Sequence, residues 1–409
     1  MKYRDCQLMK TNEKDTKQGI VPALRFPEFH GSKGWNLRPL SDYLTEYRQK
    51  SDGMSKVHSV SLSKGIVNQI EYLGRSFSAD DTSHYKLVKP YDVVYTKSPT
   101  GDFPYGIVKQ NFNLYNVIVS PLYGVFTPNN RYIGYIIHSI FESAIRLNNY
   151  LSTLVQKGAK NTIQISNDTF ISKEILLPDN DDEQQKIADC LSSIDALIKA
   201  TENKIDELKA HKKGLMQQLF PAEGKMVPTL RFPEFQNAGE WKQTTIGAIC
   251  TISNGKSNVQ DNVQNGKYPL FDRSEIIKAS NKFLFDCEAI IIPGEGRFIP
   301  KYYIGKFDLH QRAYALKDFT CHALFVYHYI TAFSFILTQK AVKSTVLSLR
   351  MPILEAFPLL LPNIQEQQKI ADCLSSVDDL ITAQANRLEA LRSHKKGLMQ
   401  QLFPNIDEC

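Results

Sequence analysis

The residue types that could support catalysis do not occur in the spacings that catalysis requires. Asn254-Gly255-Lys256-Ser257 resembles the end of a phosphate-binding loop, but that motif needs a glycine five residues before Gly255, where the chain has Cys250. Gly294-Glu295-Gly296 does not form a dinucleotide-binding motif, because Ile299 takes the place of the third glycine. The motifs of zinc hydrolases, serine hydrolases and amino-group methyltransferases are also missing from the sequence. We therefore expect a chain without a catalytic centre of its own.

The cysteines and histidines are scattered rather than clustered. None of the seven cysteines forms a Cys-x-x-Cys pair, and the nine histidines lack the spacing of metal ligands. We therefore expect neither a metal site nor a disulfide framework. The cysteines are Cys6, Cys190, Cys250, Cys287, Cys321, Cys373 and Cys409.

Lysine and threonine residues that recur in both halves of the chain are candidates for contacts with DNA phosphates. Gln-Lys-x-x-Lys-x-Thr occurs twice, followed in each half by a Leu-Leu-Pro that ends at Pro178 or Pro362. Lysine side chains are suited to phosphate contacts, which position a protein on DNA without reading its sequence. A solvated charged loop is the alternative. The candidates are Lys157, Lys160, Thr162, Lys340, Lys343 and Thr345.

Two further segments could read bases. Tyr95 to Gly106 is rich in turn formers, hydroxyls and aromatics, and residues 293 to 303 place basic side chains beside glycines that allow close backbone approach. Arginine is the residue that most often reads guanine. Ordinary surface turns are the alternative. The base-contact candidates are Lys97, Ser98, Thr100, Tyr105, Arg297, Lys301 and Arg312.

Length and composition describe an ordinary protein with more than one domain. The chain has 409 residues, 42% hydrophobic residues and a net charge of +6, which permits a nucleic-acid partner without requiring one. Apolar runs stay below the roughly 18 residues that would span a bilayer, and the N-terminus is charged from its second residue. We expect a cytoplasmic protein.

An internal repeat organises the chain. Residues 183–221 and 366–404 are identical at 28 of 39 positions. Val-Pro-Ala-Leu-Arg-Phe-Pro-Glu-Phe at 21–29 is echoed by Val-Pro-Thr-Leu-Arg-Phe-Pro-Glu-Phe at 227–235, and each is followed by one of the two tryptophans, Trp35 and Trp241. Residues 36–155 and 242–338 show no such likeness. The alike parts suggest one partner bound twice, and the unlike parts suggest recognition of two different things.

The repeated segments have the pattern of long helices. Apolar residues recur at alternating steps of four and three, which predicts a coiled-coil seam, and each segment would be about 55 Å long if unbroken. Thr201 with Gln384, and Lys212 with Lys395, would form polar layers in that seam; a frayed or hydrated layer is the alternative. Gly214 and Gly397 could end each helix, but we favour a continuous helix.

The order of segments predicts two recognition domains separated by two long antiparallel coiled-coil helices, a pseudo-two-fold circular repeat. We expect an α+β protein in which both domains are mixed α/β. The second helix has to return from the second domain to the first, so the helices should run antiparallel. The predicted segments are a tail at 1–20, a domain at 21–182, a helix at 183–220, a domain at 221–365, a helix at 366–404 and a tail at 405–409.

The helix ends are candidates for partner docking. All eleven mismatches between the two helical segments fall between positions 194 and 210, so both ends are identical. A pure spacer would need only its seam preserved, so identical ends suggest a docking surface; recent duplication is the alternative. The docking candidates are Gln184, Gln185, Lys186, Gln367, Gln368, Lys369, Lys212, Lys213, Lys395 and Lys396.

The duplicated Leu-Arg-Phe-Pro-Glu-Phe opening, the Leu-Leu-Pro before Glu-Gln-Gln-Lys-Ile-Ala and the Lys-Lys-Gly-Leu-Met-Gln-Gln-Leu-Phe-Pro ending resemble the specificity subunit of type I restriction-modification enzymes. The resemblance covers the chain beyond about residue 20. Residues 254–256, 266–271 and 292–296 resemble one common variety of recognition domain, from which the first half departs.

The resemblance implies a non-catalytic subunit that binds double-stranded DNA at a bipartite, asymmetric site. It further implies two modification subunits that carry S-adenosylmethionine and methylate adenine, and restriction subunits that use ATP and Mg²⁺. No cofactor is expected on this chain. One rival function is a coiled-coil adaptor whose domains bind protein, and another is an enzyme with unrecognised motifs.

Overall fold

The structure is a computed structural model that describes residues 19–154, 156–157, 163–343 and 345–404. Contacts divide the chain into two compact units. Unit 1 comprises Met1–Lys199 with Glu389–Cys409, and unit 2 comprises Ala200–Leu388. Both units contain helices and sheets, which confirms the expected α+β class. The domain boundaries drawn from the sequence treat the long helices as separate segments, and they stay a prediction.

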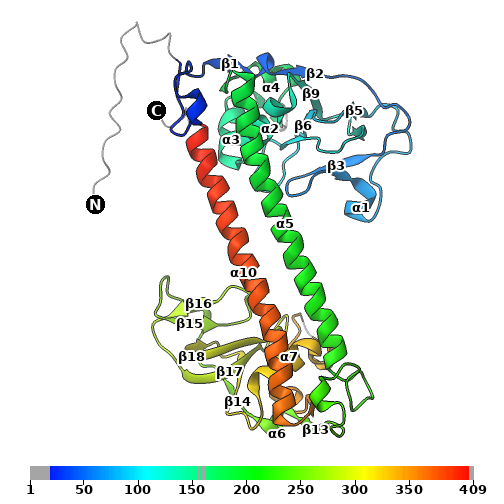
Figure 1. The fold of residues 1–409 in the computed structure, drawn as a ribbon, viewed down its shortest axis with the longest axis vertical. Coiled ribbons are helices and arrows are strands. Elements are labelled where there is room, and N and C mark those ends of the chain that lie inside the picture. The colour runs from blue at the N-terminus through cyan, green and yellow to red at the C-terminus, as the bar shows by residue number, and fades with distance from the viewer. Residues whose placement is uncertain (1–18, 155, 158–162, 344, 405–409) are drawn as a thin grey trace. The chain divides into compact units, whose positions relative to one another are not determined.

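Unit 1 is built on an antiparallel four-stranded sheet in the order β2-β9-β6-β7 (Figure 1). Helix α2 (Arg131–Phe141) packs on β7 and β9. The sheet strands are β2 (Leu44–Glu46), β9 (Gly124–Pro128), β6 (Val93–Tyr95) and β7 (Val108–Gln110). The strand pairs beside it are β1 (Leu37–Pro39) with β12 (Glu174–Leu176), β3 (His58–Ser61) with β4 (Gly65–Asn68), β5 (Lys86–Val88) with β8 (Val117–Val119), and β10 (Gln156–Lys157) with β11 (Ile163–Gln164). Shorter helices are α1 (Gln69–Leu73), α3 (Ala144–Ser152) and α4 (Asn167–Ser172).

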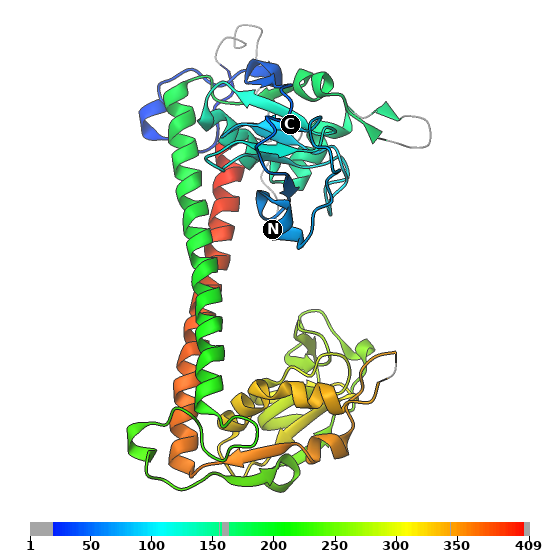
Figure 2. The same ribbon diagram turned by 90° about the vertical axis from the view of Figure 1, so that its right-hand side faces the viewer.

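Unit 2 contains a six-stranded sheet in the order β14-β19-β17-β18-β15-β16, in which only the pair β15-β18 is parallel. Helix α7 (Ala323–Ala332) packs on β17 and β18, as Figure 2 shows. The strands are β14 (Thr251–Asn254), β15 (Tyr268–Phe271), β16 (Lys278–Ser280), β17 (Phe285–Pro293), β18 (Lys301–Leu309) and β19 (Ala313–Lys317). Strand β13 (Lys242–Thr245) pairs with β20 (Pro358–Leu361), and the short helices are α6 (Ile246–Ile249), α8 (Ser334–Lys340) and α9 (Met351–Glu355).

Two long helices of 39 residues each contribute to both units: α5 (Asp181–Leu219) and α10 (Ile364–Leu402). Both continue through their glycines, Gly214 and Gly397, which confirms the expected continuous helix. Each begins with an asparagine cap, because the side chains of Asn180 and Asn363 accept the backbone N–H three residues later, at 2.9 Å. The hydrophobic seam and its polar layers stay a prediction of a coiled coil.

Within each unit the two helices run antiparallel. In unit 2, Lys212 near the end of α5 forms an ion pair with Asp378 near the start of α10, at 2.6 Å. In unit 1, Lys395 near the end of α10 forms the matched pair with Asp195 near the start of α5, at 2.7 Å. Lys212 and Lys395, which the sequence placed in one matched polar layer, therefore form ion pairs related by the sequence repeat.

Each unit has its own core, and the long helices contribute to both. The core of unit 1 contains Trp35, the start of α5 through Ile187 and Leu191, and the end of α10 through Leu402 and Phe403. The core of unit 2 contains the matched residues Trp241, Ile370, Leu374, Leu219 and Phe220. Removing apolar side chains from water is the dominant favourable term in folding, so the ends of both helices are anchored in these cores.

Candidate recognition and docking surfaces

A buried arginine joins the repeated N-terminal motif to the start of a long helix in each unit. In unit 1, Arg25 donates to both carboxylate oxygens of Glu183 at 2.6 and 2.7 Å, and the side chains are 4% and 1% exposed. In unit 2, Arg231 makes the same bidentate pair with Glu366 at 2.7 and 2.6 Å. Such charge-assisted pairs combine strength with fixed geometry. We call each arginine–glutamate pair, together with the tryptophan that follows the repeated motif, a clamp.

Each clamp also binds the end of the other long helix. The backbone N–H of Leu24 donates to the carbonyl of Gln401 at 3.0 Å in unit 1, and that of Leu230 donates to Gln218 at 2.9 Å in unit 2. The indole of Trp35 adds a hydrogen bond to Glu183 at 3.2 Å. The two motifs that repeat in the sequence therefore meet in one structural joint per unit. Their shared recurrence was the signal that could have predicted this contact.

Two of the predicted docking residues are buried, which corrects the expectation that they face a partner. Gln184 and Gln367 are 3% and 4% exposed. Their side-chain amides donate to the carbonyls of Pro178 and Pro362 at 2.7 and 2.8 Å. Their oxygens accept from Asn130 at 2.8 Å and from the backbone of His322 at 3.0 Å. Both glutamines lie on the inner face of the first helical turn and attach it to its own unit, so they are structural.

The neighbouring docking candidates are exposed. Lys186 forms an ion pair with Glu28 at 2.9 Å, and Lys369 forms the matched pair with Glu234 at 3.3 Å. Gln368 donates to Asp372 at 2.7 Å. These contacts are local and solvent-exposed, as is Gln185, so all four side chains remain available as docking candidates.

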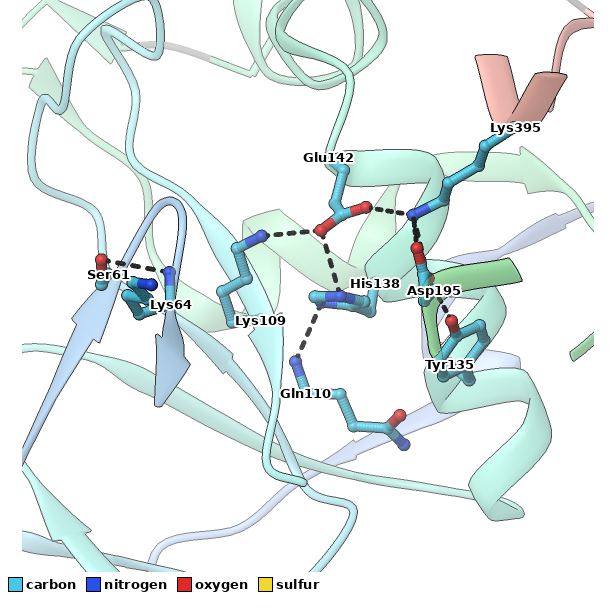
Figure 3. Close-up of polar contacts among 9 residues, drawn as sticks. All are labelled: Ser61, Lys64, Lys109, Gln110, Tyr135, His138, Glu142, Asp195 and Lys395. Carbon is cyan, nitrogen blue, oxygen red and sulfur yellow. Dashed lines mark hydrogen bonds and ion pairs between the residues drawn. The ribbon is translucent and has the colours of Figure 1, made fainter. Parts of the chain in front are cut away.

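Unit 1 contains a charge network around Lys395, drawn in Figure 3. Lys395 contacts Asp195 at 2.7 Å and Glu142 at 2.9 Å, and Glu142 also binds Lys109 at 3.0 Å. The backbone N–H of Gln110 donates to Nδ1 of His138 at 3.3 Å, so the proton of the neutral ring lies on Nε2, 3.4 Å from Glu142. The network therefore links strand β7 and helix α2 to both long helices of the unit.

Protonation in this network follows from burial and charge. Burial lowers the pKa of His138, which keeps the ring neutral at pH 7. Burial alone would raise the pKa of Glu142, but its hydrogen bond to His138 and the charges of Lys109 and Lys395 outweigh that effect and lower it. In unit 2 the buried histidine is His328 on helix α7. Burial lowers its pKa to about 3, and its ring contacts Ser375 at 3.1 Å.

Acid is expected to destabilise unit 1 through Glu142. Because its pKa is lower in the folded than in the unfolded chain, its contribution is complete above the ordinary value of 4.5 and is lost as the pH falls below it. Glu142→Gln should therefore flatten the fall in unfolding free energy between pH 5 and pH 3, measured by the fluorescence of Trp35 in a Trp241→Phe background. Glu174→Gln, which changes an exposed carboxylate of unit 1, should leave the slope as it is. An equal slope in both variants would contradict this role.

A matched pair of grooves follows the identical helix ends. The groove of unit 1, about 470 Å³, is lined by Lys395, Lys396, Met399 and Gln400 together with α2 and α3 residues. The groove of unit 2, about 730 Å³, is lined by the equivalent residues Lys212, Lys213, Met216 and Gln217. Both combine lysine charge with apolar surface, and four of the predicted docking residues line them.

The predicted base-reading loop of unit 1 is a tight turn. Lys97 has a left-handed backbone (φ 61°), and a Cβ on Gly106 would come within 2.6 Å of the Lys97 nitrogen, so only glycine fits there. Burial lowers the pKa of the half-buried Lys97. Ser98 is exposed, whereas Thr100 and Tyr105 are half-buried. The structure therefore makes Ser98 the most accessible member of this set.

The predicted phosphate contacts can be placed in unit 2. Lys340, Lys343 and Thr345 are exposed; Lys340 is the last residue of helix α8, and the other two follow it. In the first half, Lys160 and Thr162 lie outside the described residues, as does the side chain of Lys157. The contact of all six with DNA stays a prediction.

The base-reading candidates of unit 2 have different surroundings. Arg297 is exposed and pairs with Glu275 at 3.4 Å. Lys301 donates to the carbonyl of Ser274 at 2.6 Å, and burial lowers its pKa. Arg312 forms an ion pair with Glu295, beside a hollow of about 240 Å³. Arg312 is therefore held at the edge of a concave surface.

A family model described as the type I restriction modification DNA specificity domain matches residues 60–210 and, separately, residues 238–392. The chain belongs to this family. Each match to the type I specificity domain runs from a sheet into a long helix, ending in α5 or in α10. Two copies of the domain therefore account for the repeat.

Relatives of known identity agree with this family. Over 166 residues the chain is 29% identical to the type I restriction enzyme EcoDI specificity subunit of Escherichia coli. That alignment covers 40% of this chain and 37% of the E. coli protein, well under two thirds of the length of that relative.

Solved structures extend the likeness to the fold. The crystal structure of the type I restriction-modification S subunit from M. genitalium aligns over 95% of this chain and 100% of its own, with a TM-score of 0.63 and 13% identity. A structure from a study of complex assembly and conformational transition of the type I R-M system aligns over 90% of this chain and 97% of its own, at 15% identity. Its TM-score is 0.49.

Among the described residues of this specificity subunit, no group of three or more His, Cys, Asp and Glu side chains is arranged to hold a metal ion. The same part of the chain contains no helix long and apolar enough to cross a membrane.

Proposed function

We propose that this specificity subunit reads a bipartite, asymmetric DNA site, with one half-site bound by each unit. The supporting observation is the contrast between the halves. The arginine–glutamate pairs of the clamps and the long-helix residues of the grooves are matched, whereas the sheets differ in strand number and order. Two domains with different surfaces, each attached to equivalent helix ends, are suited to binding two different half-sites. Phosphate contacts would supply most of the affinity, and a few base contacts in each unit would supply discrimination.

The matched grooves are the proposed docking sites for two copies of the modification subunit. Equivalent residues of the long helices line a groove in each unit, so one partner surface could bind twice. Restriction subunits would join through the modification subunits. S-adenosylmethionine, ATP and Mg²⁺ would be bound by those partners, and this chain would carry no catalytic role.

Mapping methylated adenines across the genome, with and without this chain, tests the proposed function. We expect a two-part motif that disappears on deletion and returns with the intact gene. A motif that persists without the chain would contradict the proposal. Methylation by the purified chain alone would favour an enzyme, and a complex that binds DNA without sequence preference would favour a protein-binding adaptor.

Charge reversal in one groove is expected to remove one docked partner. Lys213→Glu with Gln217→Glu should reduce the modification subunits bound per chain from two to one, because both exposed side chains line the groove of unit 2. Lys396→Glu with Gln400→Glu should do the same in unit 1, and the combined variant should bind none. The mass of the complex in solution gives the number of copies.

The helices offer matched controls for this experiment. Lys204→Glu and Arg387→Glu reverse exposed charges at equivalent positions outside the groove linings, and should leave two copies bound. Two bound copies in the groove variants would place docking elsewhere on the chain.

A further inference from the structure

The loop after strand β17 holds a carboxylate between two arginines at a concave surface of unit 2. Glu295 forms an ion pair with Arg312 and lies 3.5 Å from Arg273. The Glu295 side chain is 20% exposed, whereas each arginine side chain is 64% exposed. The carboxylate is therefore held inward, and the guanidinium groups point toward solvent.

Glu295 and Arg312 lie between two hollows on the surface of unit 2 and line both of them. One, of about 240 Å³, is lined by Arg273, His310 and Val259, among others, and the second, of about 450 Å³, by Asn254, Arg350 and Ser348, among others. Glu295, Gln311 and Arg312 line both. Three arginines thus line the two hollows, and two of them contact Glu295. Among the described lining residues the one other acidic side chain, Asp272, is paired with Lys278 at 2.6 Å. The surface keeps an excess of positive charge.

The backbone beneath the pair is fixed. The N–H of Gly294 donates to the carbonyl of Arg312 at 2.8 Å, and the N–H of Leu349 donates to the carbonyl of Gly294 at 2.8 Å. A Cβ on Gly294 would lie 2.4 Å from the Arg312 oxygen, so only glycine allows this approach. Gln311 is tied in turn to Asn258 through its side chain, at 2.7 Å. Backbone hydrogen bonds therefore fix the main chain at both partners of the ion pair.

The chemistry of the pair favours a base edge over a phosphate. A phosphate offers only acceptors and negative charge, which Glu295 would repel. A guanine·cytosine pair in the major groove offers the guanine O6 and N7 acceptors to an arginine, and the cytosine amino group as a donor to a carboxylate. A guanidinium oriented by a neighbouring carboxylate keeps N–H groups free for such a bidentate contact.

We propose that Arg312, oriented by Glu295, reads a guanine·cytosine base pair in the half-site bound by unit 2. The assignment rests on the proposed function and specifies the residues that perform it. Glu295 accepts from the cytosine amino group or holds the arginine for guanine, and Arg273 and Arg350 contribute positive charge on either side.

The test uses the complex of this chain with its modification subunits and a pool of DNA duplexes randomised at each position. Sequencing of the bound fraction gives the preference at every position. Arg312→Ala is expected to lower the preference for guanine at one position by one to two orders of magnitude, with the other positions unchanged. Arg312→Lys keeps the charge but loses the planar fork, so it should lose the same preference while retaining overall affinity. Glu295→Gln should weaken that preference in part.

Arg297→Ala is the matched control, because Arg297 is also exposed and ion-paired but lines neither hollow. It is expected to leave every preference intact. A uniform loss of binding in Arg312→Ala, or an unchanged preference, would overturn the assignment while leaving the proposed function standing. A wild-type complex without any sequence preference would overturn the proposed function itself.

Discussion

Glu183→Ala is expected to destabilise unit 1 by about 3–5 kcal/mol, the usual cost of breaking a buried ion pair by removing one partner. The substitution leaves the guanidinium of Arg25, which is 4% exposed, without its carboxylate, and it removes the acceptor of the Trp35 indole. An unpaired buried charge is far more costly than the loss of the attraction itself. Glu366→Ala should have a similar effect on unit 2 through Arg231.

The two tryptophans allow each unit to be followed separately. In a Trp241→Phe background the fluorescence of Trp35 reports unit 1 during urea unfolding, and Trp35→Phe isolates unit 2 in the same way. Lys186→Ala is the control, since it removes an exposed pair with Glu28 and a cation–π contact with Phe26, and it should cost less than about 1 kcal/mol. If Glu183→Ala unfolds at the same urea concentration as this control, the clamp does not stabilise the unit.

Exchanging residues 36–178 for the equivalent segment of another family member is expected to abolish methylation at the original motif and to create one that keeps a single half. The exchanged segment contains the sheet and loops of unit 1, while Arg25, Trp35 and Glu183 of the clamp lie outside it. The groove of unit 1 keeps its α10 residues, although its α2 and α3 lining is exchanged, so docking through the α10 residues should survive.

Genome-wide mapping of methylated adenines measures the outcome. The reciprocal exchange of residues 242–362 serves as the internal comparison and should change the other half of the motif. Donor segments need side chains equivalent to Asn130 and Tyr135, because these contact Gln184 and Asp195 on helix α5. A motif unchanged by either exchange, in a complex that still assembles, would refute recognition by these segments.

The helices, their continuity and the family could be predicted from the sequence because those signals are local or duplicated. A seam of apolar residues and a near-copy of it define α5 and α10 directly. The burial of Gln184 and Gln367 could not be predicted in this way. It depends on which chain segment covers the first helical turn, and Asn130 and His322, which do so, lie in divergent regions.

Long-range electrostatics escaped prediction for a related reason. Arg25 and Glu183 are 158 positions apart, and nothing near either residue indicates the other. The sheets were equally hard to predict, since many of their strands have only three or four residues and pair with distant partners. Pairwise recurrence in both halves was the available signal for the clamp. The Lys395–Asp195 pair recurs in the same way, but no comparable signal exists for Lys109 and Glu142, because both lie in the divergent part of the chain.

The division of the chain into units also sets an order of events during synthesis. Unit 2 is one uninterrupted stretch, Ala200–Leu388, so all of its residues are available once that stretch has left the ribosome. Unit 1 lacks Leu402 and Phe403 of its core until the last helix is complete, although most of its residues are made first. The core of unit 1 therefore stays incompletely packed until the final residues have been synthesised. A premature stop codon in the last helix would thus damage the N-terminal unit before the C-terminal one.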